Sequence, residues 1–212
     1  LEIKKTSDAY FERGFAKELI EDYKGAYQDF TKAINLEDDP WKLIKFYMRR
    51  SASIMMRDYY KTHTKKEIEN GIEKKDLLIN TYNESLKDDT KAIQNAEKLK
   101  DKKLLAGLYR LRSLTYQSLN RHQESINDCK KIIYLFPKKA EGYNCLGEKK
   151  LILKDHKGSI QDYTKAIELE PNLLSYRNRA GLKNKLNDYH GAINDYSEAI
   201  RLEKDNIWDL EA

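Results

Sequence analysis

The sequence alternates between two kinds of amphipathic segment. Apolar and aromatic residues recur at helical spacing in five first segments, and each is followed, after a short polar break, by a second apolar segment. We therefore expect five pairs of antiparallel helices joined by short turns. The first segments comprise residues 10–19, 46–56, 109–119, 143–153 and 176–186.

The second segments are copies of one another. One pattern is shared by residues 22–34, 156–167 and 189–200: Gly, then Ala or Ser, then Tyr or Ile, any residue, Asp, an aromatic residue, any two residues, Ala and Ile. Residues 85–93 and 125–132 are degraded copies of it. The small residues Ser125, Ser159 and Ala192 lie 34 and then 33 residues apart. A fixed period of this length indicates a repeat array, in which each helix pair buries its apolar face only by stacking on its neighbours.

These motifs resemble the tetratricopeptide repeat family. The first-helix motif of that family is similar to Tyr10-Phe11-Glu12-Arg13-Gly14, Tyr143-Asn144-Cys145-Leu146-Gly147 and Tyr176-Arg177-Asn178-Arg179-Ala180. The resemblance implies an all-α, right-handed superhelix of about five helix pairs, forming one array over residues 1–212. Its repeats would span residues 7–40, 44–99, 106–137, 140–172 and 173–206, with residues 207–212 starting a capping helix or a sixth repeat.

The second repeat is longer than the others. Ser51 and Ser85 are separated by 34 residues, whereas the equivalent Gly14 and Ala26 are separated by 12, which leaves a surplus of 22. The surplus, around residues 60–82, is helix-compatible on both sides of a turn signal at Asn70-Gly71. We predict an elongated helical hairpin in which the surplus is shared equally between the two helices. At 1.5 Å per residue, this makes the pair about 16 Å longer than the others. A charged, irregular loop is the alternative.

Two charged positions also recur with the period of the repeat. We predict that they form ion pairs between the two helices of a repeat and fix helix register more than they add stability. An aspartate occupies one position in all five repeats, as Asp29, Asp88, Asp128, Asp162 and Asp195. An arginine occupies the other in four, as Arg13, Arg50, Arg112 and Arg179.

The resemblance also implies that first helices line a concave groove that holds a peptide or protein partner. In the first two repeats this groove would be aromatic and rich in methionine, which suits the apolar side chains of a partner. Coverage of this wall by other parts of the chain, as ordinary core, is the alternative. The candidate partner-binding residues are Phe11, Phe15, Leu19, Met48, Met55, Met56, Arg110, Asn144 and Arg177.

We therefore expect a scaffold or adaptor that binds a protein or peptide. Self-assembly of the array, giving a homo-oligomer, is the second hypothesis. The carboxylate clamp by which one subgroup grips chaperone tails is disfavoured, because its slots hold residues such as Phe11, Phe15 and Arg49. RNA binding is disfavoured. Most of the fifteen tyrosines fall at packing positions, where they are not available to stack on bases.

Composition adds few constraints. The net charge of +5 is the small difference between 40 cations and 35 anions mixed along the chain, and no apolar run could span a bilayer. We expect no catalytic site, cofactor or metal: phosphate-loop and zinc motifs are absent, and three of the histidines follow the repeat period. Cys129 and Cys145 are expected to be reduced, packed thiols. Without a signal-like start, a cytoplasmic location is favoured, although a missing leader would leave the same sequence.

Overall fold

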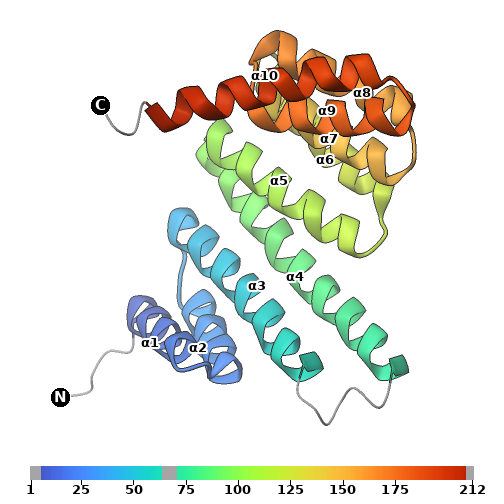
Figure 1. Ribbon diagram of the computed structural model, residues 1–212. Helices are drawn as coiled ribbons and strands as arrows, with labels where there is room; N and C mark the ends of the chain where they lie inside the picture. Colours follow the sequence, from blue (N-terminus) through green and yellow to red (C-terminus); the bar gives the residue numbers. More distant parts are fainter. Residues whose placement is uncertain (1–5, 64–70, 209–212) are drawn as a thin grey trace, which may run out of the picture. The chain divides into compact units, whose positions relative to one another are not determined.

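A computed structural model describes residues 6–63 and 71–208, and within these ranges the regular structure is entirely helical (Figure 1). The all-α prediction and its paired helices are therefore confirmed. The first half contains α1 (Ser7–Leu19), α2 (Tyr23–Asn35), α3 (Pro40–His63), α4 (Gly71–Leu99) and α5 (Lys102–Ser118). The second half contains α6 (His122–Leu135), α7 (Ala140–Ile152), α8 (His156–Leu169), α9 (Leu173–Lys185) and α10 (Tyr189–Trp208).

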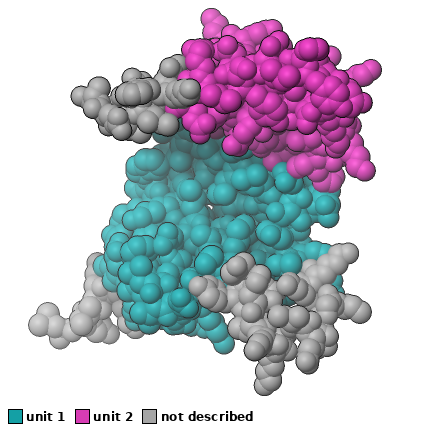
Figure 2. All heavy atoms as spheres, viewed as in Figure 1, with its two compact units in different colours: residues 1–121 teal, residues 122–212 magenta. Residues whose placement is uncertain are grey.

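The chain separates into two compact units, residues 1–121 and residues 122–212 (Figure 2). Unit 1 holds α1 to α5 and unit 2 holds α6 to α10. Inside each unit, helices adjacent in sequence pack against one another, as expected for a repeat array. The boundary falls at the turn between the two helices of the third repeat.

Short polar signals start the second helices. Asp22, Asp155 and Asp188 each precede a helix, and their side chains accept hydrogen bonds from the backbone N–H groups of the glycines three residues on, at 2.9, 2.9 and 3.0 Å. An aspartate at this position satisfies an N–H group that the helix itself leaves unpaired. The preceding turns each contain a residue in the left-handed region, such as Asn187 at φ 65°. These local devices produce the tight reversal inside a repeat.

The second repeat is built from long helices. α3 has 24 residues and α4 has 29, whereas α1 and α2 have 13 each. The prediction of an elongated helical hairpin is confirmed, and the turn predicted near residue 70 lies partly outside the described residues. The side chains of Ile68 and Ile72 lie outside the described part of this hairpin, and Ile79 is exposed. At the other end of the chain, α10 continues through Trp208, so residues 207 and 208 prolong this helix.

Small residues let the helices of a repeat approach closely. Phe11, Phe30 and Phe46 form the centre of an apolar cluster, with the Phe11 and Phe46 rings stacked 4.6 Å apart. A methyl carbon placed on Gly14 would lie 2.7 Å from the Phe30 ring, and one on Gly147 would lie 3.1 Å from the Tyr163 ring. The Phe30 and Tyr163 rings are completely buried, and the short distances show that each ring packs directly against the glycine of the facing helix.

The predicted ion pairs between arginine and aspartate are seen in the first, second and fifth repeats. The guanidinium groups donate two hydrogen bonds each to the carboxylate in Arg13–Asp29, Arg50–Asp88 and Arg179–Asp195, at distances between 2.7 and 2.9 Å. In the fourth repeat Leu146 occupies the arginine position, and Lys150, one helical turn later, binds Asp162 at 2.7 Å instead.

Burial and pairing act in opposite directions on these carboxylates. Hydrogen bonds from Arg13 and Lys17, aided by their charges, lower the pKa of Asp29 to about 2 against the effect of burial. Burial raises the pKa of Asp195, but the hydrogen bonds and charges of Arg179 and Lys183 outweigh it, so the net shift is downward. Burial dominates at Asp88, whose pKa is raised despite Arg50.

A second contact recurs where one repeat meets the next. We call the packing of a second helix on the following first helix a joint. At three joints the arginine of the repeating position donates through Nη1 to a threonine of the preceding helix, in Arg50–Thr31 (3.1 Å), Arg112–Thr90 (3.4 Å) and Arg179–Thr164 (3.0 Å). Each arginine therefore links its own repeat to the previous one.

The remaining joint, between α6 and α7, is closed by a covalent bond. Cys129 and Cys145 form a disulfide, with their Cα atoms 5.5 Å apart. The expectation of reduced thiols was wrong, because the joint brings the completely buried aromatic position of α6 directly against the first helix of the next repeat. In the neighbouring joint the same two positions hold Tyr163 and Asn178, which meet through a 3.3 Å hydrogen bond.

Candidate partner-binding groove

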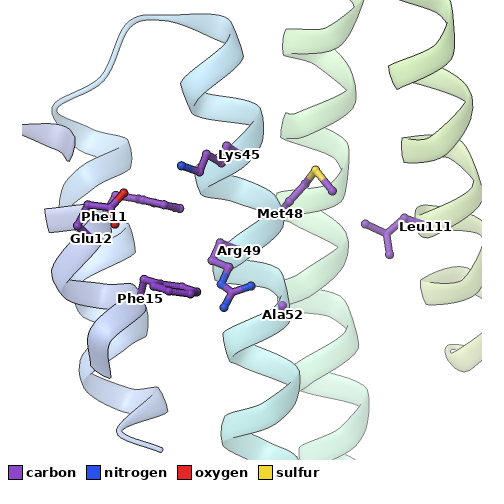
Figure 3. Close-up of a pocket in the computed structure, with 8 residues that line it drawn as sticks. All are labelled: Phe11, Glu12, Phe15, Lys45, Met48, Arg49, Ala52 and Leu111. Atoms are coloured by element: carbon purple, nitrogen blue, oxygen red, sulfur yellow. The ribbon is translucent and has the colours of Figure 1, made fainter. Parts of the chain in front are cut away.

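A pocket of about 590 Å³ lies in unit 1 between the first helices of the first three repeats. It is lined by Phe11, Glu12, Phe15, Lys45, Met48, Arg49, Ala52 and Leu111. Figure 3 shows the rings of Phe11 and Phe15 extending from α1 toward α3, and Leu111 extending from α5 toward Met48. The volume is within the range typical of pockets that accept a small ligand or a few side chains, about 300–1,000 Å³.

The walls of the pocket combine apolar surface with ordered cations. The guanidinium of Arg49 lies 4.7 Å from the centre of the Phe15 ring, and the ammonium of Lys45 lies 4.3 Å from the centre of the Phe11 ring. Glu18 of α1 accepts a 2.5 Å hydrogen bond from Arg49 Nε and a second one from Ser53. Glu18 therefore links α1 to Arg49 and Ser53 of α3 beside the pocket.

Two smaller hollows continue this surface along α3 and α5. One has a volume of about 460 Å³ and includes Trp41, Lys45, Met48 and Leu104 in its lining. The other, of about 410 Å³, includes Met48, Leu104 and Gly107. Met48 lines all three hollows and its side chain is exposed, so it is the central apolar group of this groove.

The comparisons with known proteins agree with this architecture. A sequence model described as tetratricopeptide repeat matches residues 106–139 and 140–173, which correspond to the third and fourth repeats. Residues 106–173 are therefore tetratricopeptide repeats. A search of curated protein sequences finds no match.

Solved structures share the tetratricopeptide repeat fold over nearly the whole chain. A crystal structure of MamA is 17% identical, with 93% of this chain and 92% of that chain aligned and a TM-score of 0.62. MamA from Desulfovibrio magneticus RS-1 is 10% identical, with coverage of 94% and 96% and a TM-score of 0.63. YrrB, described as a TPR protein with an unusual peptide-binding site, is 12% identical, with coverage of 99% and 93% and a TM-score of 0.57. At these identities the likeness shows the fold alone.

The groove of unit 1 contains some of the predicted residues. Phe15 and Met48 line the pocket and are exposed, as expected for a contact surface. Phe11 also lines it, but only 5% of its surface is exposed, because its ring belongs mainly to the core of the first repeat. Leu19 and Met56 are exposed outside the three hollows, and Met55 is half-buried.

The remaining predicted residues are not part of this pocket. Arg110 is half-buried on α5, and Arg177 is exposed on α9 of unit 2. Asn144 is buried, and its side-chain oxygen accepts a 2.7 Å hydrogen bond from Ser175, so it joins α7 to α9 and is not a groove residue.

Sequence reasoning missed several contributors to the groove, among them Trp41, Leu104 and Leu111. Trp41 is the second residue of α3, just after Pro40, and was treated as part of a boundary between repeats. Its exposure, which is unusual for a tryptophan, is visible only in the structure. Leu104 belongs to the first turn of α5, before the stretch of helical periodicity that was assigned to the third repeat.

Within the described residues, no helix combines the length and apolar character needed to cross a membrane. Nor do histidine, cysteine and acidic side chains gather anywhere in the described part of the chain in a way that could hold a metal ion.

Proposed function

We propose that this protein binds a segment of a partner protein in the groove of unit 1, with an apolar side chain of the partner inserted between Phe15, Met48 and Leu111. The observation that carries the proposal is the 590 Å³ pocket, built by three successive first helices and lined by exposed aromatic and methionine side chains. Exposed apolar surface inside a shaped hollow is typical of sites that bind partner side chains.

The charges around the pocket suggest the polar character of the ligand. Arg49 is paired with Glu18, but Lys45 is exposed, and its described contact is with the face of the Phe11 ring. A carboxylate or a backbone carbonyl of the bound segment would complement Lys45 beside the apolar anchor. The ligand class is therefore a peptide segment with a large apolar residue, next to which a backbone carbonyl or a carboxylate faces Lys45. YrrB, with its peptide-binding site, supports this use of the fold.

The test starts from peptides selected from a random library against the full chain. Their affinities are then measured for Phe15→Ala and Met48→Ala, each compared with a matched control on the same helix. Leu19→Ala on α1 and Met56→Ala on α3 remove exposed apolar side chains outside the three hollows. Loss of a central apolar contact is expected to cost ~1–2 kcal/mol, or about 5- to 30-fold in affinity.

The proposal predicts that the two groove variants weaken binding by this factor and that the two controls leave it unchanged. Circular dichroism should show equal helix content in all four variants. Peptides that bind all four equally well, or a selection that yields no binding peptide, would contradict the proposal.

A further inference from the structure

Gly107, in the interior of α5, is a glycine that packing within the chain does not require. Glycine inside a helix is less favourable than alanine, because it loses more conformational freedom on folding. At Gly14, Gly142 and Gly147 of other first helices, an added Cβ atom would lie 2.7, 2.6 and 3.1 Å from a neighbouring side chain, so close packing favours glycine there. At Gly107 no described atom lies within 4 Å of that position. Contacts among the described residues therefore do not offset what this glycine costs the helix.

The open space at Gly107 belongs to the groove of unit 1. Gly107 is exposed and, together with Met48 of α3, lines the hollow of about 410 Å³. Leu104 lies three residues before it and Leu111 four residues after it, which places all three on one face of α5. Both leucines also line hollows of the groove. This apolar face of α5 is therefore interrupted by a gap in which a side chain is missing, and we call the space between Leu104 and Leu111 the notch.

The charged groups that line the two smaller hollows differ in how they are engaged. Asp101 accepts a 3.0 Å hydrogen bond from the backbone N–H of Leu104 and caps the start of α5. Asp39 caps α3 in the same way, through backbone N–H groups at 2.8 and 3.1 Å. Lys103 and Lys45, in contrast, are exposed. The surroundings of the notch therefore combine apolar surface with ammonium donors, which suits the carbonyl oxygens of a peptide main chain.

We propose that the main chain of the bound partner segment lies in the notch, against the backbone of α5 at Gly107. This inference rests on the proposed function, because it concerns the same segment whose apolar side chain occupies the pocket. Met48 lines both the pocket and the hollow that contains the notch, so a segment anchored in the pocket reaches Gly107 over a continuous surface. A residue without a Cβ atom allows a second backbone to approach a helix closely. Gly107 thus determines affinity by leaving room for the segment.

The proposal separates stability from binding at residue 107. In the free chain, Gly107→Ala adds a methyl group in open space and improves helix propensity, so the melting temperature should rise by about 1–4 °C. In the complex the same methyl group would occupy the notch and hold the segment away from α5. Overpacking of this kind corresponds to a loss of affinity of about 5- to 150-fold. Unfolding cannot explain such a loss, because the variant is the more stable protein.

The test uses the full chain and a fluorescently labelled peptide from the library selection, whose affinity is measured by anisotropy. Gly107→Ala and the larger Gly107→Leu are compared with Gly181→Ala. Gly181 is exposed in the interior of α9 and lines none of the three hollows, and a Cβ atom added there would lie 3.8 Å from the Tyr196 hydroxyl, an ordinary contact distance. This control should gain similar thermal stability and bind the peptide unchanged. Phe15→Ala and Met48→Ala, measured with the same peptide, test the groove itself.

Gly107→Ala should weaken binding by the stated factor, and Gly107→Leu should weaken it further, with full helix content by circular dichroism in both. If both bind as tightly as the unaltered chain while Phe15→Ala and Met48→Ala bind more weakly, the peptide occupies the pocket without the notch. That result would overturn this inference and leave the proposed function standing. If none of these four variants weakens binding, the proposed function fails as well. An equal loss in Gly181→Ala would also overturn the inference, since a stiffer helix rather than a filled notch would then be the cause.

Discussion

The interior glycines of three first helices allow a quantitative test of how closely the repeats are packed. Gly14, Gly147 and Gly107 each lie well inside a helix, so replacement by alanine brings the same gain in helix propensity, about 0.5–1 kcal/mol. They differ in what an added methyl group would meet. The nearest atom is 2.7 Å away for Gly14 and 3.1 Å away for Gly147, and nothing lies within 4 Å of Gly107.

The cost at Gly14 arises because the Phe30 ring cannot move aside. Phe30 is completely buried, and its ring lies 5.4 Å from that of Phe11, which in turn stacks on Phe46. Overpacking of this kind typically costs about 1–3 kcal/mol, which exceeds the gain in helix propensity. We expect Gly14→Ala to lower the free energy of unfolding by about 1 kcal/mol or more, and Gly107→Ala to raise it by about 0.5–1 kcal/mol. Gly147→Ala should fall between them.

Thermal melting followed by circular dichroism measures these differences. One kcal/mol corresponds to roughly 2–4 °C for a chain of this size, so Gly14→Ala should melt several degrees below Gly107→Ala. Chemical unfolding of the same three variants provides an independent free energy. If Gly14→Ala melts at or above the temperature of Gly107→Ala, the close approach of α1 to Phe30 does not constrain the repeat, and this account of the core is refuted.

Two further predictions concern polar and covalent contacts. Burial, opposed by hydrogen bonds from Thr115 and Ser51, raises the pKa of Asp89 from 3.8 to about 6. Protonation of Asp89 therefore favours the folded state. Its contribution to the free energy of unfolding should be present below about pH 4 and be lost as the pH rises through 6. Asp89→Asn should therefore gain ~1–3 kcal/mol at pH 7.5 and little at pH 4 in denaturant titrations, and an equal effect at both pH values would contradict the assignment. Reduction of the disulfide between Cys129 and Cys145, which are 16 residues apart, should destabilise unit 2 by ~3 kcal/mol. A Cys129→Ala/Cys145→Ala variant should not respond to the reductant. Equal melting temperatures of the unaltered chain with and without reductant would rule out this stabilisation.

The sequence predicted those features that depend on one repeat unit. The helix pairs, the long second repeat, and the pairing of Arg13, Arg50 and Arg179 with their aspartates follow from local periodicity and from positions that recur. Three side chains inside one helix pair, such as Arg13, Gly14 and Asp29, are related by fixed offsets, so a pattern of spacing is sufficient to place them.

Features that arise between repeats could not be predicted in the same way. Asn144 has the position of a groove residue, but Ser175 of the next first helix binds it, and its role depends on that neighbour's identity. Cys129 and Cys145 belong to different repeats, and only their joint brings them together. The pocket also needs Leu111, whose meeting with Met48 depends on how α5 packs near α3. In each case the spacing of residues within one repeat does not show which side chain of the next repeat they contact.

The disulfide between α6 and α7 makes one of the four joints different in kind from the others. In an array where each helix contacts mainly its neighbours, melting can start at an end and spread helix by helix. Fraying that begins at α10 can detach α9 and α8 in turn, but it cannot separate α7 from α6 while the sulfur–sulfur bond is intact. A protein pulled from its C-terminus should therefore lengthen as α10, α9 and α8 detach and then stop at the disulfide, and a reducing agent should remove this stop.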